Sequence, residues 1–178
     1  MNRLILICML IICNFIAKGQ EINNVDRFGE KQGLWLTYYG KSNRIKWKHY
    51  YKNDQLDSIQ VLYYKNGNIK SLQSFDKGIQ DGLFEVYYKN GNLKRQFYTR
   101  FGVLEGPYKY YWESGKLFRS GSFKNDMDDG KSIRYHQNGK VWVEENYTMD
   151  KLDGIVRKYN SDGKLIEELE YRNGKKVK

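Results

Sequence analysis

The chain has 178 residues and a formal net charge of +10, and 16% of its residues are aromatic, whereas only one is proline. This length allows one ordinary domain, and the aromatic content argues against disorder and favours strands over helices. We therefore expect an all-β protein whose positive charge would suit an anionic or acidic partner.

The N-terminal segment, residues 1–19, has the features of a secretory signal peptide. Arg3 precedes a mostly apolar run, and Ala17-Lys18-Gly19 is a small-x-small site before Gln20. The run is too short to span a membrane comfortably, so we expect cleavage before Gln20 and export to the periplasm, the cell surface or the exterior. The alternative is a lipoprotein attached through Cys13, but a bulky isoleucine precedes that cysteine where a small residue is expected.

The two cysteines, Cys8 and Cys13, both belong to this segment, so the mature chain would have no disulfide and no thiolate metal ligand. Export without disulfides is more typical of a bacterial envelope or exterior than of a small stapled secreted domain. Loss of Arg3 and Lys18 lowers the formal charge from +10 to +8. The expected partners are an acidic protein, an acidic glycan or anionic lipid headgroups, and no nucleic acid is expected because an exported chain lacks access to it.

A repeat with a period of 24 residues follows a lead-in at residues 20–32. The phrase YYKNGNIK at residues 63–70 returns as YYKNGNLK at residues 87–94, and columns of single residues keep the same spacing. The columns are Tyr63, Tyr87, Tyr111, Tyr135 and Tyr159; Gly67, Gly91, Gly115, Gly139 and Gly163; and Gly82, Gly106, Gly130 and Gly154. A fixed period of this size is the signature of a repeat architecture in which each unit packs on its neighbours.

Each unit predicts two strands, because it contains two turn signals. In residues 82–105 these signals are Lys89-Asn90-Gly91 and the step from Glu105 to Gly106, and they separate runs of about seven to ten residues. Helices are excluded because Asn-Gly would recur inside them. The predicted fold is an elongated, open, single-sheet antiparallel β-meander built from tandem 24-residue β-hairpins.

The predicted repeat domain comprises about six units over residues 33–174, and a basic tail follows at residues 175–178. The first unit fits with one extra residue in its turn, where GKSN replaces KNG. Ser58 then replaces a repeat glycine. Such degeneracy near an end is typical of a capping repeat.

The length of the KNG turn decides which columns share a face of the sheet. We expect a three-residue loop with Gly91 in the left-handed conformation, which places Tyr87 opposite Leu93. Strand alternation then puts Thr99 on the same face, together with its aromatic equivalents in the other units. This interpretation gathers three regular columns into one buried stripe.

The opposite face is the candidate binding surface. Its side chains beside the KNG turns are aromatic or basic in the middle of the array and more polar toward the end. The candidate residues are Tyr64, Tyr88, Trp112 and His136 before the turns and Lys70, Lys94, Phe118 and Trp142 after them. The alternative is that a curled sheet, a terminal segment or a second copy of the chain covers these side chains.

The sequence contains no recognisable catalytic or metal-binding constellation. His49 and His136 occupy non-equivalent positions without a cysteine or a second histidine at ligand spacing, so we expect no metal site. The acidic column that runs from Asp57 to Asp153 is interpreted as turn chemistry, since a residue present in every unit usually serves the fold. No nucleophile, phosphate-binding or dinucleotide motif occurs. We therefore expect a non-enzymatic protein without cofactors.

The pattern Gly-x-aromatic-x-x-Tyr-Tyr-x-Asn-Gly-x-Leu, followed by aromatic-x-x-Gly-x-x-Asp-Gly, resembles the bacterial variant of the MORN (membrane occupation and recognition nexus) repeat. The residues that carry the resemblance, with their equivalents over residues 33–174, are Gly82, Tyr87, Asn90, Gly91, Leu93, Asp129, Gly130, Tyr135, Asn138 and Gly139. The unit is longer and poorer in glycine than the eukaryotic form, so the phospholipid and scaffold roles of that form carry over weakly. The resemblance implies a twisted antiparallel meander used for binding or scaffolding, without catalytic residues.

The leading functional hypothesis is an exported protein-binding or scaffold module, in which the candidate surface presents aromatic side chains to another protein. The alternative is recognition of cell-envelope glycan or anionic lipid, with rings stacking on sugars and lysines meeting acidic groups. Many similar bacterial proteins are labelled as antitoxins, so a further alternative is an immunity protein for an exported toxin.

Overall fold

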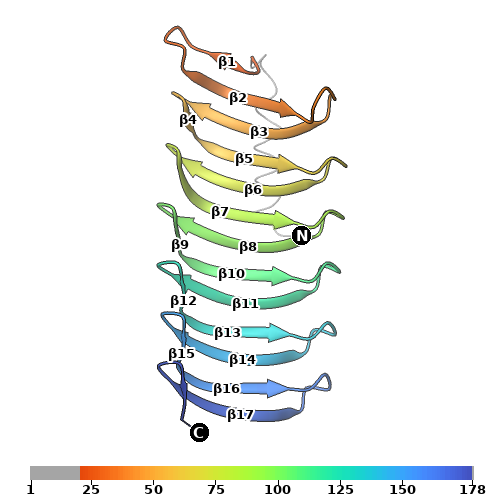
Figure 1. Ribbon diagram of the computed structural model, residues 1–178, viewed down its shortest axis with the longest axis vertical. Helices are drawn as coiled ribbons and strands as arrows, with labels where there is room; N and C mark the ends of the chain where they lie inside the picture. The colour runs from red at the N-terminus through yellow and green to blue at the C-terminus, as the bar shows by residue number, and fades with distance from the viewer. Residues whose placement is uncertain (1–20, 178) are drawn as a thin grey trace, which may run out of the picture.

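The computed structural model describes residues 21–177, and all of their regular structure is β (Figure 1). The long strands are β2 (Lys31–Tyr38), β3 (Ile45–Lys52), β5 (Ser58–Tyr63), β6 (Ile69–Asp76), β7 (Ile79–Tyr87), β8 (Leu93–Arg100), β10 (Gly106–Tyr111), β11 (Leu117–Lys124), β13 (Gly130–Tyr135), β14 (Val141–Thr148), β16 (Gly154–Tyr159) and β17 (Leu165–Arg172). The short strands are β1 (Asn24–Val25), β4 (Gln55–Leu56), β9 (Val103–Leu104), β12 (Met127–Asp128), β15 (Lys151–Leu152) and β18 (Lys175–Lys176).

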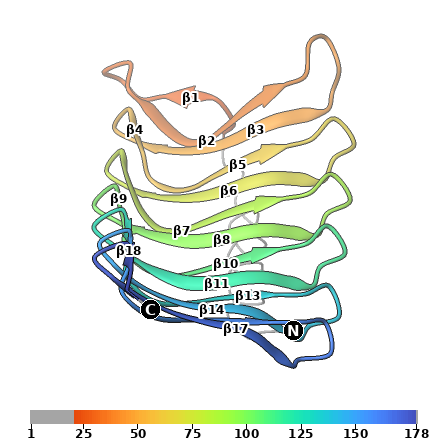
Figure 2. The same ribbon diagram turned by 60° about the horizontal axis from the view of Figure 1, so that its bottom comes forward.

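The long strands form one open antiparallel sheet in which each strand pairs with the next along the chain. The hairpins stack in sequence order, so the molecule is elongated along the stacking direction (Figure 1). The strands are also bent, which makes the sheet a curved trough (Figure 2). The predicted all-β meander of tandem hairpins is confirmed. The expected signal peptide at residues 1–19 lies outside the described residues.

One edge of the trough carries the turns formed by the KNG phrase, which we call the wide turns. In the turn at 88–92 the Tyr88 amide donates to the Asn92 carbonyl at 2.8 Å, and the Gly91 amide donates to the Tyr88 carbonyl at 3.0 Å. Gly91 has a φ of +94°, a conformation that glycine adopts without steric cost. The predicted three-residue loop is confirmed. The wide turns comprise residues 39–44, 64–68, 88–92, 112–116, 136–140 and 160–164.

The other edge carries two-residue turns, which we call the narrow turns. In one of them Phe101 and Gly102 have φ values of +52° and +83°, as a type I′ hairpin turn requires. Each narrow turn also bonds to the preceding repeat: the Asp126 amide donates to the Leu104 carbonyl, and the Asp126 Oδ1 accepts from the Leu104 amide at 2.7 Å. Asp54 and Asp150 accept equivalent bonds. The narrow turns therefore fix the stacking of successive hairpins.

The predicted grouping of columns on the two faces is wrong in one respect. Tyr87 does pair with Leu93, but the neighbouring pair is Val86 with Arg95, so Lys94 is the extra residue of a β-bulge. A bulge inserts one residue and reverses the alternation beyond it. Thr99 therefore lies opposite Gly82, on the other face from Tyr87. No residue type in the sequence marks this bulge.

The two faces of the sheet differ in packing, and we call the more densely packed one the inner face. It carries the rings of Phe84 and Phe97, whose centroids are 4.6 Å apart, and the aromatic column equivalent to Thr99. Among its side chains, Tyr108 and Ser132 are only 1% and 2% exposed. The outer face carries the tyrosine column that begins with Tyr63. The core of the molecule is thus a thin layer, most of it along the inner face.

Candidate interaction surface

The residues of the wide turns bind the next repeat, which explains why the phrase YYKNGN recurs. The Tyr88 hydroxyl donates to the Tyr111 carbonyl at 2.9 Å. The amides of Asn90 and Asn92 both donate to the Glu113 carbonyl, at 3.1 and 2.9 Å. The same bonds recur between other repeats, from Tyr39, Tyr64, Asn66, Asn68, His136 and Asn138. Each turn is thereby held against its neighbour at several points.

The eight predicted binding residues come together as four pairs, one in each of four successive repeats. Lys70 Nζ lies 5.8 Å from the centroid of the Tyr64 ring, and Lys94 Nζ lies 5.3 Å from that of Tyr88. The remaining pairs are Trp112 with Phe118, with ring centroids 4.4 Å apart, and His136 with Trp142, with centroids 5.7 Å apart. We call these eight residues the aromatic row.

The aromatic row lies along the wide-turn side of the inner face. The Arg134 guanidinium lies 5.4 Å from the Trp142 ring centroid and also forms an ion pair with the buried Glu145 of that face. Trp142 is 37% exposed, and Lys70 and Lys94 are exposed as well. The tyrosine hydroxyls of the row are used inside the protein, so its accessible parts are ring surfaces and ammonium groups.

Trp112 is the irregular member of the row. It occupies the repeat position equivalent to Tyr88, but its indole N–H is buried and has no hydrogen-bond partner. The same turn has Ser114 and Lys116 where the preceding turn has Asn90 and Asn92. The side-chain bonds that link the other wide turns to the next repeat are therefore missing here, among the residues that the structure describes.

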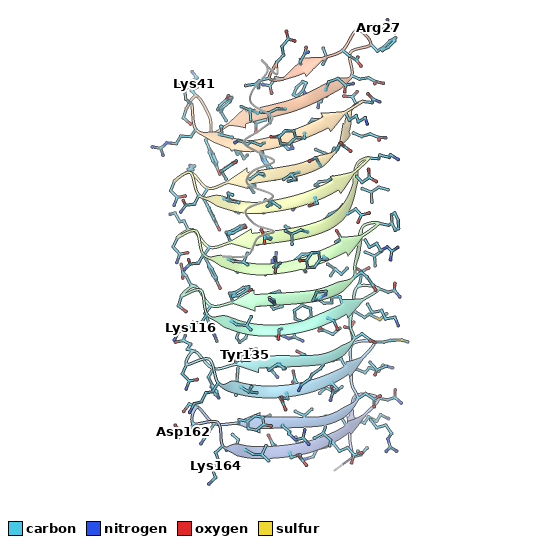
Figure 3. All side chains as sticks on the ribbon, turned by 180° about the vertical axis from the view of Figure 1, so that it is seen from behind. Arg27, Lys41, Lys116, Tyr135, Asp162 and Lys164 are labelled. Carbon is cyan, nitrogen blue, oxygen red and sulfur yellow. The ribbon has the colours of Figure 1, made fainter. Side chains whose placement is uncertain are left out.

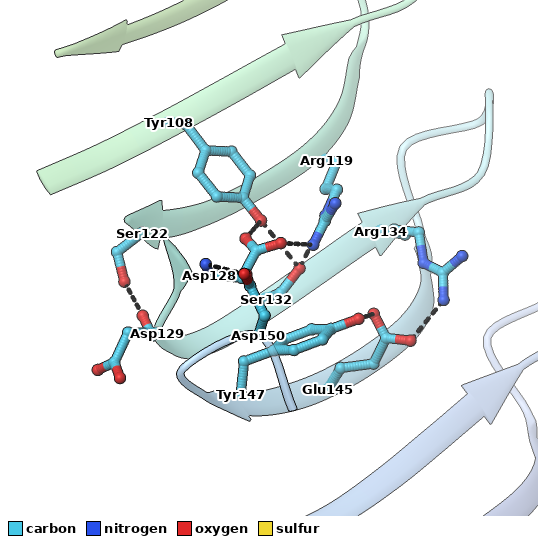
Figure 4. Close-up of polar contacts among 10 residues, drawn as sticks. All are labelled: Tyr108, Arg119, Ser122, Asp128, Asp129, Ser132, Arg134, Glu145, Tyr147 and Asp150. Atoms are coloured by element: carbon cyan, nitrogen blue, oxygen red, sulfur yellow. Dashed lines mark hydrogen bonds and ion pairs between the residues drawn. The ribbon is translucent and has the colours of Figure 1, made fainter. Parts of the chain in front are cut away.

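A polar cluster fills the inner face in the fourth and fifth hairpins (Figure 4). The Tyr108 hydroxyl donates to Asp128 Oδ1 at 2.7 Å, and Arg119 bonds both Asp128 and Ser132 at 3.1 and 3.0 Å. Burial raises the pKa of Tyr108 well above its ordinary value. Because the members satisfy one another, the cluster stabilises the fold and offers no free reactive group. No repeat pattern in the sequence marks this cluster, since its residues vary from repeat to repeat.

The acidic column has the fold role that was predicted for it. The carboxylates of Glu105, Asp129 and Asp153 accept hydrogen bonds from the first amide of the next repeat's narrow turn, at 3.1 to 3.4 Å. His49 lies apart from this column and bonds the Gln60 amide at 2.9 Å. The described residues contain no group of three or more histidine, cysteine, aspartate or glutamate side chains that would hold a metal ion.

Together these features define a class: a tandem-hairpin repeat protein with an aromatic and basic row on one side of a curved sheet. The chain belongs to the MORN repeat variant family, whose model matches residues 56–77, 80–100, 104–125, 128–148 and 152–173. MORN repeats are commonly modules that bind proteins or lipids. A search of curated proteins finds no match. Within residues 21–177 there is no helix long and apolar enough to cross a membrane.

Proposed function

We propose that this protein is an exported, non-enzymatic module that binds another protein through the aromatic row. The observation that carries the proposal is the regular placement of four side-chain pairs, three of which are held by a bond to the next repeat. Rigid aromatic side chains lose little conformational entropy on binding and are enriched among the residues that dominate protein interfaces. Cations beside the rings favour a partner with acidic groups.

The residue that tests this proposal best is Trp142, because it is both aromatic and 37% exposed. Full-length protein with an affinity tag is used as bait in an extract of the native cell envelope, and the captured proteins, glycans and lipids are identified. The expected result is one stoichiometric protein that Trp142→Ala binds roughly tenfold or more weakly, as truncation of an interface aromatic commonly does.

The matched control is Phe101→Ala, which removes an exposed aromatic side chain from a narrow turn on the opposite edge. This variant should retain the partner fully. Equal binding of the partner by wild-type protein and by a folded Trp112→Ala, Trp142→Ala double variant would contradict the assignment of the binding surface to the aromatic row.

The proposal of export rests on the sequence of residues 1–19. Fractionation of native cells should place the protein outside the cytoplasm, and N-terminal sequencing of the purified protein should begin at Gln20. A cytoplasmic protein that still begins at Met1 would contradict export and would reopen partners inside the cell.

A second candidate function is recognition of acidic glycan or anionic lipid in the cell envelope. It is favoured by the exposed ammonium groups of Lys70 and Lys94, which lie over tyrosine rings. Such binding should fall steeply with added salt, whereas binding through Trp142 should change little. A third candidate, immunity to an exported toxin, rests on the resemblance to antitoxins and would be supported by a toxin gene beside this one.

A further inference from the structure

Positive charge is concentrated in the first half of the sheet. Residues 21–104 contain 14 lysines and arginines against 8 aspartates and glutamates, whereas residues 105–177 contain 14 against 13. All six ion pairs among the described residues lie between Arg119 and Arg172. The second half thus neutralises itself, and the first half carries cations that have no carboxylate at ion-pair distance within the described chain.

The free cations of the first half gather at its wide turns. The segments 39–46, 64–70 and 88–95 together contain eight lysines and arginines and no acidic residue. We call these three segments the basic edge. By contrast, the later segments 112–119 and 160–167 contain acidic residues of their own. In Figure 3 the wide-turn edge can be followed from Lys41 in the first turn to Lys116 and Lys164 in later turns.

The cations of the basic edge stand at a regular interval. Lys46, Lys70 and Lys94 lie over the rings of Tyr39, Tyr64 and Tyr88, at 5.9, 5.8 and 5.3 Å from the ring centroids. Each ring is held by its hydroxyl bond to the next repeat. Successive repeats are offset by two strand spacings, so equivalent cations recur about every 10 Å along the sheet.

A shallow depression of about 460 Å³ separates the first two wide turns. Its lining includes Arg44 and Lys65, together with Tyr39 and Ser42. Arg44 bonds the Lys65 carbonyl at 3.0 Å, which fixes its guanidinium at this place. The depression can therefore receive a carboxylate beside two cations, at one end of the row of lysines.

We propose that the basic edge binds an extended acidic segment of the partner protein, with an acidic side chain at every third residue. The proposal rests on the proposed protein-binding function and specifies the chemistry of the partner. In the extended polyproline II conformation every third side chain points the same way and the chain rises about 3.1 Å per residue, so three residues span about 9 Å, close to the interval between equivalent cations. Acidic residues at every second position would be about 6 to 7 Å apart, which does not match the interval between equivalent lysines.

The test compares two synthetic peptides that have the same composition and three aspartates each. In the first peptide the aspartates stand at positions 1, 4 and 7 of a Ser/Gln background, and in the second they are adjacent. Binding to full-length protein is measured by isothermal titration calorimetry at low salt. We expect the spaced peptide to bind at least about threefold more tightly, because it meets three cations at once. Equal affinity, or no binding of either peptide, would overturn the proposal.

Variants locate the contact on the sheet. Lys70→Gln and Lys94→Gln should each lower the affinity for the spaced peptide by about threefold, as expected for exposed charge pairs. The matched controls are Lys116→Gln and Lys164→Gln, which remove exposed lysines from wide turns of the second half and should leave binding unchanged. Equal losses from all four variants would show a response to net charge alone and would also overturn the proposal.

Two further outcomes separate this inference from the proposed function. If Trp142→Ala abolishes capture of the protein partner but the spaced peptide does not bind, the protein-binding function stands and the acidic segment is wrong. Phosphatidylglycerol vesicles provide the second outcome. If they bind more tightly than the spaced peptide, and if Lys70→Gln and Lys94→Gln lower the affinity for vesicles equally, the basic edge recognises lipid and the inference of a protein segment fails.

Discussion

Ser58 shows how a single residue carries strain that glycine avoids at the equivalent position of other repeats. Its φ is +69°, and the equivalent residues Gly82, Gly106, Gly130 and Gly154 have φ values between +90° and +114°. A side chain in the left-handed region costs about 1 to 2 kcal/mol, which glycine avoids. The fold thus requires a special backbone conformation at this position even where the sequence does not supply glycine.

Ser58→Gly should therefore stabilise the protein, but by less than the strain itself. Glycine also gains entropy in the unfolded chain, which opposes the effect, so the expected net gain in unfolding free energy is about 0.5 kcal/mol. Gly106→Ala should cost about 1 kcal/mol or more, although a methyl group there would meet no atom within 4 Å. Urea denaturation of the wild-type protein, Ser58→Gly and Gly106→Ala measures both changes in unfolding free energy. A gain from Gly106→Ala would contradict the explanation by backbone strain.

His49 predicts a pH dependence of stability. Burial, together with the nearby positive charge of Lys31, lowers the pKa of His49 from its ordinary value of 6.5. The folded state therefore disfavours the protonated ring, so the contribution to stability is present above pH 6.5 and is lost as the pH falls below it. Wild-type protein should lose more stability between pH 7.5 and 5.5 than His49→Gln does. Equal losses in thermal denaturation would refute the role of His49.

At the scale of the structural elements, the wide turn at residues 112–116 lacks the side-chain bonds that hold other wide turns to the next repeat, among the residues that the structure describes. Trp112→Tyr should place a hydroxyl where Tyr88 has one, and should remove a buried indole N–H that lacks a partner. One new hydrogen bond contributes about 1 kcal/mol, so unfolding free energy should rise by about that amount. Partner binding should fall because the aromatic row loses its larger ring. Calorimetric unfolding measures the change in stability, and capture measures partner binding. Trp112→Phe is the control, because it cannot form the hydrogen bond.

The hairpin was predictable from sequence because its turn residues strongly favour one backbone conformation. Gly91 with Asn90 specifies the three-residue loop, and the acid and glycine before each long strand specify its start. The bulge at Lys94 was not predictable, because the equivalent positions are Lys70, Phe118 and Trp142, and nothing in their chemistry marks an extra residue. The position of Thr99 was consequently assigned to the wrong face.

The candidate surface was predicted in part for the same reason. Residues next to the turn, such as Tyr88 and Lys94, were paired correctly because only a few residues separate them. The bond from the Tyr88 hydroxyl to the next repeat was missed, since it depends on the offset between hairpins. The Tyr108 and Asp128 contact was missed because it joins residues of different hairpins through the curvature of the sheet.

At the scale of the whole molecule, the N-terminal lead-in covers the first edge of the sheet. Asn23 covers the edge of β2: its side chain accepts from the Leu36 amide at 2.7 Å and donates to the Leu36 carbonyl at 3.3 Å, and its own amide donates to the Leu34 carbonyl. An uncovered strand edge is a template for pairing with another chain. The N-terminal lead-in thus protects the first hairpin from edge-to-edge association.

Asn23→Ala should increase self-association, because it frees both backbone groups of Leu36. Light scattering after size-exclusion chromatography should show dimers or larger species at concentrations where the wild-type protein is monodisperse. Asn66→Ala is the matched control, since it removes a bond between wide turns without uncovering an edge. Unchanged mass for Asn23→Ala would refute the protective role of Asn23.

The uneven distribution of ion pairs divides the sheet into two parts with opposite responses to ionic strength. Screening weakens the attraction between charges such as Arg134 and Glu145 in the second part, and it weakens the repulsion among the unpaired cations of the first. Because each hairpin touches only its neighbours, the two parts can open separately. Salt should therefore slow amide exchange in the first hairpins and accelerate it in the last ones, so that ionic strength decides which end of the protein opens first.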